Sequence, residues 1–362
     1  MTVGPPPASD TADGVGRRAQ AFRRCPTGTS RLHGRVATAL GGSDEALRAL
    51  EAAGARQPAL VLAALHDLVL AGRAPSLAAA YAGGDLEPAG LAAVETVVRR
   101  ADEVVAVAAG RRLRTGETGL AAVLHPAVAR AASRAGADAV GLVGLRCSAG
   151  SDLQLDRVGV AYDDGRSLGD PTSPVQHRAS VRGGRPVPVR PLPGVVARVG
   201  VDRDPLDVAD ADDVRWLRAC VPPDEPGRAA ALEAELALAV GAPPVLLRGD
   251  EVERLPDAVE LVPAGALPVL MTTWALSSWT PARRRALLRR LEDVAARRPV
   301  AWVSVEGVGV APGVPTLGDR PASGHSTVGV TVLDGSRRRV EVVGRCWGRG
   351  RWLSWLADED GG

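Results

Sequence analysis

The sequence predicts an α/β fold in which a helical N-terminal domain precedes a mostly parallel sheet that ends in an antiparallel hairpin. Three observations support this prediction. Apolar residues recur at helical spacing up to residue 135, whereas beyond it strand-length apolar runs alternate with helical segments. The pair Asp334-Gly335, which favours a hairpin turn, separates the last two runs. With 362 residues, the chain is long enough for a large α/β domain and a smaller companion.

The N-terminal part is predicted to be helical. Residues 1–18 are rich in proline, alanine and acid, lack the apolar stretch of a signal peptide, and are expected to form a disordered tail. A helical domain is expected over residues 19–135, interrupted by glycine and proline. Its predicted helices are Asp44–Ala53, Pro58–Ala71, Leu91–Ala109 and Gly119–Ala135.

Residues 136–362 are predicted to form the sheet domain, because a strand followed by a helix, repeated, produces right-handed crossovers and parallel pairing. The predicted strands are Val140–Cys147, Val195–Asp202, Pro244–Arg248, Leu267–Thr272, Val300–Glu306, Thr327–Leu333 and Val340–Cys346. The predicted helices are Asp152–Val158, Asp210–Cys220, Gly227–Val240 and Pro281–Arg297. A parallel sheet that ends in an antiparallel hairpin is similar in outline to the Rossmann-like sheet of class I methyltransferases.

Two long loops interrupt the alternation. Residues 163–194 are dense in proline, glycine and arginine and are expected to form an insertion that acts as a lid, a substrate loop or a surface element. Residues 307–324 form the second loop, after the fifth strand. The arginine clusters at 283–285, 289–290 and 297–298 are predicted to form the solvated face of a helix.

Composition limits the classes of partner. The formal net charge is only +2 and every basic residue is an arginine, so neither nucleic acid nor an anionic membrane is an expected partner. The longest apolar stretch, Ala59–Ala71, is too short to span a bilayer, and a cytoplasmic protein is expected. The four scattered cysteines predict buried thiols rather than disulfides or a metal site. A small molecule or a protein remains as partner, and the oligomeric state stays open.

Candidate cofactor-binding residues follow the first three strands, because ligands of open α/β sheets bind at the carboxyl ends of the strands. The turn after the first strand contains Cys147, Ser148 and Gly150. Asp202 ends the second strand, where a carboxylate can accept both hydroxyl groups of a ribose. Asp250 follows the third strand, where it can accept a hydrogen bond from an adenine amino group.

Candidate catalytic residues end the next two strands. Thr273 ends the fourth strand, where groups that face a methyl acceptor are usual, and Glu306 ends the fifth. Structural alternatives remain open. Asp202 could instead cap its own loop, and Glu306 could be a solvated loop acid.

Short motifs along the chain indicate a family. They are Leu65-His66-Asp67-Leu68, Thr115-Gly116-Glu117, Ser148-Ala149-Gly150, Asp156-Arg157, Arg198-Val199-Gly200-Val201-Asp202, Trp216-Leu217-Arg218-Ala219-Cys220, Gly249-Asp250, Ser304-Val305-Glu306 and Gly350-Arg351-Trp352-Leu353-Ser354-Trp355. With these motifs the chain resembles, over nearly its whole length, the uncharacterised bacterial domain-of-unknown-function family 2332. The resemblance implies a Rossmann-type methyltransferase fold behind a helical domain. It suggests S-adenosylmethionine as the only cofactor and Glu117 as an acid that reaches the methyl acceptor.

The chain departs from the family pattern at polar positions. Gly144 replaces an acid, Thr272 replaces a histidine, and Arg146 replaces a glycine. These changes suggest a divergent paralogue whose ancestral site has been lost or rebuilt. A guanidinium in the glycine turn needs an anionic partner, and Arg146 is expected to pair with Asp202 and fill the ribose site.

The sequence is therefore compatible with three functions. The first is an S-adenosylmethionine-dependent methyltransferase of unknown acceptor. The second is a non-catalytic member of the same fold that binds a ligand or a protein. The third is an interaction protein that uses an exposed apolar patch over Trp347–Trp355.

Overall fold

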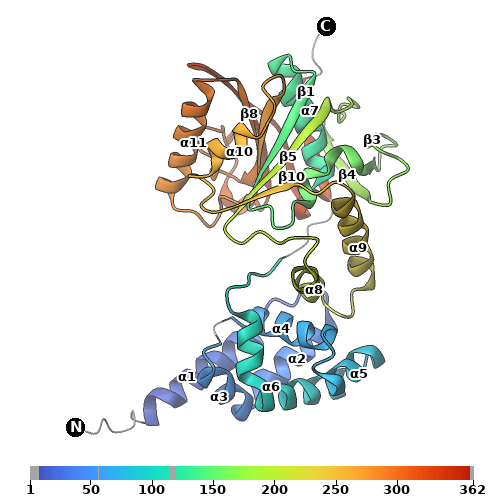
Figure 1. The fold of residues 1–362 in the computed structure, drawn as a ribbon, viewed down its shortest axis with the longest axis vertical. Helices are drawn as coiled ribbons and strands as arrows, with labels where there is room; N and C mark the ends of the chain where they lie inside the picture. The colour runs from blue at the N-terminus through green and yellow to red at the C-terminus, as the bar shows by residue number, and fades with distance from the viewer. Residues whose placement is uncertain (1–7, 56, 115–119, 359–362) are drawn as a thin grey trace, which may run out of the picture. The chain divides into compact units, whose positions relative to one another are not determined.

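The computed structural model describes residues 8–55, 57–114 and 120–358, and the chain divides into two compact units (Figure 1). Unit 1 combines Met1–Gly116 with Ala209–Leu232. Unit 2 combines Glu117–Val208 with Glu233–Gly362.

Unit 1 is helical. Its helices are α1 (Ala8–Arg23), α2 (Arg31–Gly42), α3 (Asp44–Ala52), α4 (Pro58–Leu70), α5 (Pro75–Gly83), α6 (Leu86–Ala108) and α8 (Ala211–Ala219). The long helix α6 packs against α2, α3, α4 and α5. Ser30 and Ser43 cap α2 and α3 by accepting backbone N–H groups. The first helix begins at Ala8, within the segment for which the sequence predicts a tail.

The helix α8 joins unit 1 although it lies far along the chain. It packs against α4, where Arg215 Nε donates to the buried Asp67 carboxylate at 3.1 and 3.2 Å. Ser30 Oγ and the Leu32 N–H both donate to Asp224, which follows α8. Residues 209–232 therefore complete a core that the N-terminal helices begin.

Unit 2 is built on one mixed sheet. Its strands are β1 (Ala139–Leu145), β2 (Gly159–Tyr162), β3 (Ser167–Gly169), β4 (Gln176–Gly184), β5 (Gly194–Asp202), β6 (Val245–Arg248), β7 (Leu267–Thr273), β8 (Val300–Gly307), β9 (Ser326–Asp334), β10 (Arg337–Trp347) and β11 (Trp352–Trp355). Within the described ranges these eleven strands follow the order β3-β2-β4-β11-β10-β9-β8-β7-β1-β5-β6. The run from β8 to β6 is parallel, whereas β9 and β10 pair antiparallel.

Helices cover both faces of this sheet (Figure 1). One face packs against α7 (Ala121–Ala135), which shares a core with Leu142, Val269 and Val303. The other face packs against α10 (Leu255–Glu260) and α11 (Pro281–Ala295). The helix α9 (Pro226–Gly241) leads into β6, and its residues from Glu233 onward belong to unit 2. The α/β class, the mostly parallel sheet and the hairpin at Asp334-Gly335 are confirmed.

One local expectation is wrong. Residues 152–158 do not form one helix but two short 3₁₀ turns, Ser151–Leu153 and Leu155–Arg157, because the three consecutive residues from Leu153 to Leu155 are all buried, whereas an α-helix buries positions three or four apart. The insertion expected over residues 163–194 is not irregular throughout. It contains β3 and β4, which extend the sheet beyond β11.

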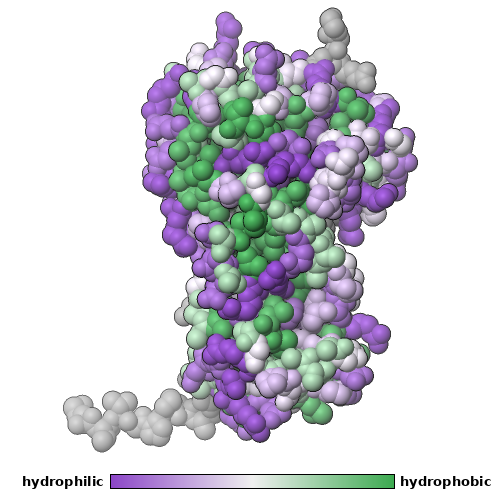
Figure 2. Space-filling model, turned by 45° about the vertical axis from the view of Figure 1, so that its right-hand side comes forward, coloured by the Kyte–Doolittle hydropathy of each residue, from purple (hydrophilic) through white to green (hydrophobic). Residues whose placement is uncertain are grey.

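The apolar patch expected over Trp347–Trp355 does not form. Trp355 is 1% exposed, and Trp347 packs its ring against His325 with centroids 5.2 Å apart. Of the described tryptophans only Trp352, at 49%, is strongly exposed. Figure 2 shows hydrophobic and hydrophilic residues interspersed on the visible face.

Within the described residues, no single helix is both long and apolar enough to cross a membrane. Only α4 and α5 taken together reach that length and composition, and they are bent by 98° relative to each other.

Candidate functional site

Of the predicted site residues, those that the structure describes gather at one edge of the sheet in unit 2. The strands β5, β1, β7 and β8 are neighbours in that order and run parallel, so their carboxyl ends meet at this edge. The order along the chain reverses between β1 and β7, since β5 and β6 lie on one side of β1 and β7 and β8 on the other. Open α/β sheets bind ligands at such a reversal.

The backbone at this edge is strained. Arg146, Ser148 and Trp274 have φ angles of 56°, 57° and 49° although none is a glycine. Among the described residues, only Leu317 shares this property. A side chain in the left-handed region costs about 1–2 kcal/mol per residue, and such strain persists where the surroundings enforce it. Here it lies on the turns that follow β1 and β7.

Asp202 holds the turn after β1. The residue is 1% exposed, and its Oδ2 accepts the Ser148 N–H at 3.1 Å while its Oδ1 accepts the Asp204 N–H at 2.9 Å. The carboxylate therefore lies at the predicted place beside the predicted turn. Its described contacts match the structural alternative, in which Asp202 organises its own loops.

The glycines of this edge are covered by protein side chains. A Cβ built on Gly200 would lie 2.4 Å from Cys147 Sγ, and one built on Gly144 would lie 3.1 Å from Cys147 Cβ. A Cβ on Gly150 would lie 2.7 Å from Pro244 Cγ. A nucleotide-type cofactor uses the space above such glycines. Cys147 and Pro244 take the space beside these glycines in this arrangement.

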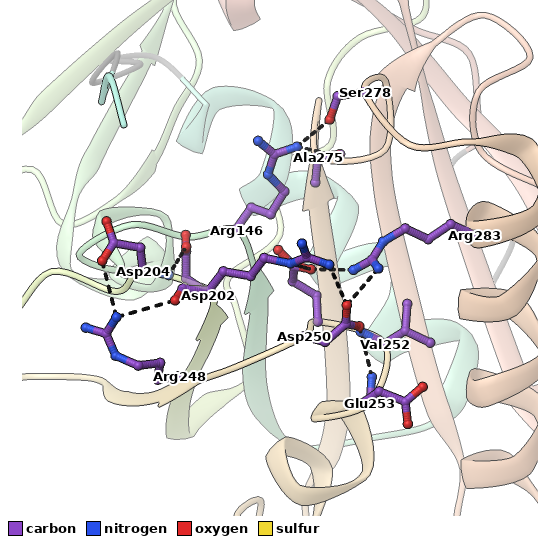
Figure 3. A network of polar contacts seen from close by, with 12 residues as sticks. Arg146, Asp202, Asp204, Arg248, Asp250, Val252, Glu253, Ala275, Ser278 and Arg283 are labelled. Atoms are coloured by element: carbon purple, nitrogen blue, oxygen red, sulfur yellow. Dashed lines mark hydrogen bonds and ion pairs between the residues drawn. The ribbon is translucent and has the colours of Figure 1, made fainter. Parts of the chain in front are cut away.

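The pairing expected between Arg146 and Asp202 is wrong. Arg146 Nη1 donates to Ala275 O at 3.1 Å and to Ser278 Oγ at 2.6 Å, both in the loop after β7. Figure 3 shows the Arg146 side chain directed toward Ser278 and away from Asp202. The left-handed backbone of Arg146 turns its side chain toward β7 instead of β5. Arg146 thereby ties the two strained turns together.

Asp250 lies in a network of ion pairs (Figure 3). Its Oδ2 is 2.6 Å from Arg203 Nη2 and 2.7 Å from Arg283 Nη1, and Arg283 also binds the buried Glu251 at 2.6 Å. Burial alone would raise the pKa of Asp250, but hydrogen bonds from Arg283, the Val252 N–H and Arg203 lower it to about 2. The carboxylate expected to bind adenine thus binds two guanidinium groups.

The sequence predicts that the arginines of α11 form a solvated helix face. In the structure, two of them also bind residues of neighbouring loops. Arg283 binds both acids at the end of β6, and its guanidinium lies 4.2 Å from the Trp279 ring centroid. Arg284 donates to Leu276 O at 2.9 Å and to Ser277 O at 3.1 Å. The sequence pattern gives no signal for these contacts, because an amphipathic helix predicts only which face is polar.

Glu306 holds the loop after β7. Its side chain accepts the Leu276 N–H at 3.1 Å and the Ser277 hydroxyl at 3.5 Å, and only 1% of the residue is exposed. Burial raises the pKa of Glu306 to about 7, although hydrogen bonds from Leu276, Thr272 and their neighbours oppose the shift. The alternative of a solvated loop acid is therefore wrong.

The two other predicted catalytic residues have different outcomes. Thr273 lies at the end of β7, where its Oγ1 donates to Asp152 Oδ2 at 3.4 Å. Glu117 lies outside the described residues.

A polar pocket beside this edge was missed by the sequence predictions. Asp152, Gln154, His177 and Glu235 line a cavity of about 20 Å³ in unit 2, together with apolar residues. Burial, and then the charge of Asp152, raise the pKa of Glu235 to about 7. A weak signal was present in the sequence, since Glu235 is followed by the apolar residues from Leu236 to Val240 of α9. In the described part of the chain, no three metal-ligating side chains lie close enough together to hold a metal ion.

Comparison with known proteins gives one match. The model of a family described as "Uncharacterized protein conserved in bacteria (DUF2332)" matches residues 17–355. No curated protein and no solved structure matches the chain.

Proposed function

Starting from the membership of this chain in the bacterial family DUF2332, we propose that it is a non-catalytic, ligand-binding α/β protein of the Rossmann-like methyltransferase type. The ligand binds at the carboxyl ends of β1 and β7. The observation that carries the proposal is the strain in the two turns there, at Arg146, Ser148 and Trp274. Strain of this kind is characteristic of binding sites, where it prepares the backbone for a ligand.

The strand order supports the fold type. Without the inserted β2, β3 and β4, the five parallel strands β6-β5-β1-β7-β8 correspond to the order 3-2-1-4-5 of doubly wound nucleotide-binding sheets, whereas β9 pairs antiparallel with β8. A fold of this type serves many functions, so the contacts at the site have to decide between them.

The acids at the site support binding without catalysis. Asp202 and Glu306 accept backbone N–H groups of the loops that follow the strands, and Asp250 is neutralised by Arg203 and Arg283. An acid that transfers a proton has to reach the reacting atom. These three carboxylates instead maintain the shape of the site.

A methyltransferase that uses S-adenosylmethionine is the second candidate. Asp202 at the end of β5, beside the left-handed Ser148, favours it, because a carboxylate at that place suits a ribose. This candidate requires Cys147 to leave the space above Gly200.

Mapping of fragment binding by amide NMR tests the proposal. Small polar fragments that bind should shift the amide signals of Arg146, Ser148 and Trp274. Ser148→Leu places a larger side chain in the strained turn and should abolish these shifts. The control Leu317→Ala changes the fourth described residue of this backbone type, away from the β1 and β7 turns, and should preserve them. Fragments that cluster on another surface, or that bind Ser148→Leu equally well, would contradict the proposal.

A further inference from the structure

The pocket beside the sheet edge has an unusual set of polar atoms. Its polar lining residues include Asp152 from the first 3₁₀ turn, Gln154 from the link to the second, His177 from β4 and Glu235 from α9. Apolar side chains, among them Leu155 and Leu238, form the rest of the wall. All of these residues belong to unit 2.

Gln154 presents an unsatisfied acceptor there. The residue is 2% exposed, and its Nε2 donates to Ala242 O at 2.9 Å. This bond fixes the orientation of the amide, so the other terminal atom is the carbonyl oxygen Oε1. Oε1 has no hydrogen-bond partner among the residues that the structure describes. A buried acceptor of this kind calls for a donor.

Two carboxylates share the wall with that oxygen. Glu235 is partly buried, and its pKa is raised by burial and by the charge of Asp152, so the two acids repel each other as Glu235 ionises. Burial lowers the pKa of His177, so its ring does not supply a compensating charge at neutral pH. The pocket thus combines the carbonyl oxygen of Gln154 with two carboxylates.

We propose that this pocket binds a primary ammonium group. Such a group carries one positive charge and three N–H donors, which match the carboxylates of Asp152 and Glu235 and the Oε1 of Gln154. The cavity of about 20 Å³ has room for a group of the size of water, and a trimethylated nitrogen lacks the N–H donors that Oε1 of Gln154 needs. The inference rests on the proposed function in so far as the ammonium group belongs to the ligand of the neighbouring sheet edge.

One contact links the pocket to that edge. Thr273 Oγ1, at the end of β7, donates to Asp152 Oδ2 at 3.4 Å, and Trp274 with its strained backbone follows directly. A ligand with its amine in the pocket would therefore place its remaining atoms beside the strained turns.

Thermal unfolding at constant ionic strength tests the inference. Methylammonium and n-butylammonium chloride should raise the Tm in a saturable manner. Tetramethylammonium chloride, n-butanol and sodium chloride should not. Glu235→Gln should weaken n-butylammonium binding at least tenfold, whereas Glu253→Gln, which alters a strongly exposed acid elsewhere in unit 2, should leave it unchanged.

A second variant keeps the test valid if Glu235→Gln does not fold. Gln154→Met preserves the volume of the side chain but removes Oε1, and it should also weaken n-butylammonium binding. An equal response to tetramethylammonium, or full binding by both variants, would overturn the inference. The two proposals fail separately. Ammonium binding without amide NMR shifts at Ser148 and Trp274 would support the pocket and contradict the sheet-edge site. Amide shifts caused by neutral fragments, without any ammonium binding, would support the sheet-edge site and contradict the pocket.

Discussion

Arg146 illustrates how single residues shape this site. Its backbone is left-handed, where a glycine would be unstrained, and its guanidinium bridges from the β1 turn to the loop after β7 through Ala275 O and Ser278 Oγ. The bridging hydrogen bonds of Arg146 are therefore accompanied by a strained backbone at the same residue. Removing the side chain and removing the strain should have separable effects.

Two substitutions at this position separate them. Arg146→Ala removes the bridging hydrogen bonds and keeps a Cβ in the left-handed region, whereas Arg146→Gly removes both. We expect the glycine variant to be more stable than the alanine variant by about 1 kcal/mol. Urea unfolding of both variants measures the difference. Equal stabilities, or a more stable alanine variant, would show that the turn is not strained.

Glu306 should make stability depend on pH. Its folded pKa of about 7 lies above the ordinary 4.5, so the folded state holds the proton more tightly than the unfolded state does. Stability from this group is full below pH 4.5 and is lost as the pH rises through 7.

The variant Glu306→Gln removes this dependence. The unfolding free energy of the variant minus that of wild type should increase by up to about 3 kcal/mol when the pH rises from 4 to 8, since each pKa unit corresponds to 1.36 kcal/mol. Urea unfolding at the two pH values measures the gain. A difference between the two proteins that does not change with pH would contradict the buried, protonated acid.

At the scale of elements, the turn after β1 packs closely on β5. Gly144 and Gly200 are register partners, and the Cys147 side chain lies where a Cβ on Gly200 would be. The close approach of the turn to the strand therefore depends on Gly200.

Gly200→Ala tests this packing. The added methyl group would meet Cys147 Sγ at 2.4 Å and Leu246 at 2.6 Å, so we expect a loss of about 1–3 kcal/mol of unfolding free energy. Cys147→Ala in the same chain should recover part of the loss. Gly227→Ala, with no atom within 4 Å of the added Cβ, should cost nothing. If the Gly200 and Gly227 variants are equally stable, the account of this turn is wrong.

The elements that the sequence predicts are those with a strong local pattern. The strands Leu267–Thr273 and Val300–Gly307 are buried over nearly their full length, and each appears as an apolar run. Two of the missed strands lack this pattern, whereas Gly159–Tyr162 and Trp352–Trp355 are mostly buried but have only four residues each. Ser167–Gly169 has only three residues, and Gln176–Gly184 is mostly exposed, so their pairing with distant partners decides their conformation.

At the scale of the whole molecule, the chain contributes to unit 1 twice. The helix α8 follows β5 in the sequence, and its local pattern predicts an ordinary crossover helix of the sheet. Its membership in unit 1 depends on long-range pairs such as Asp67 with Arg215 and Ser30 with Asp224. No local pattern encodes such pairs, so the sequence did not predict them.

The pair between Asp67 and Arg215 can be tested in the intact chain. Asp67 is 3% exposed, and Asp67→Ala should destabilise unit 1 by about 1–3 kcal/mol. Hydrogen exchange should then rise in α4 and α8 but not in β7 or β8. Asp212→Ala removes the exposed partner of the same arginine and should have little effect. Equal effects of the two variants would argue against the buried pair.

The site was predictable in position but not in chemistry. Asp202 and Glu306 lie at the strand ends where the sequence places them, because the strand pattern determines where parallel strands end. Other side chains near this edge were not predictable, since Arg283, Pro244 and Glu235 come from helices and loops whose approach depends on the folded chain.

The central claim is that this protein is a non-catalytic member of its fold that does not bind the methyltransferase cofactor. Calorimetric titration of the purified protein with S-adenosylmethionine and S-adenosylhomocysteine tests it most directly. The filled space above Gly150 and Gly200 predicts no detectable heat and no change in Tm at high ligand concentration. Micromolar binding of either compound that Asp202→Ala abolishes in a folded variant would contradict the claim and establish a cofactor site of the methyltransferase type.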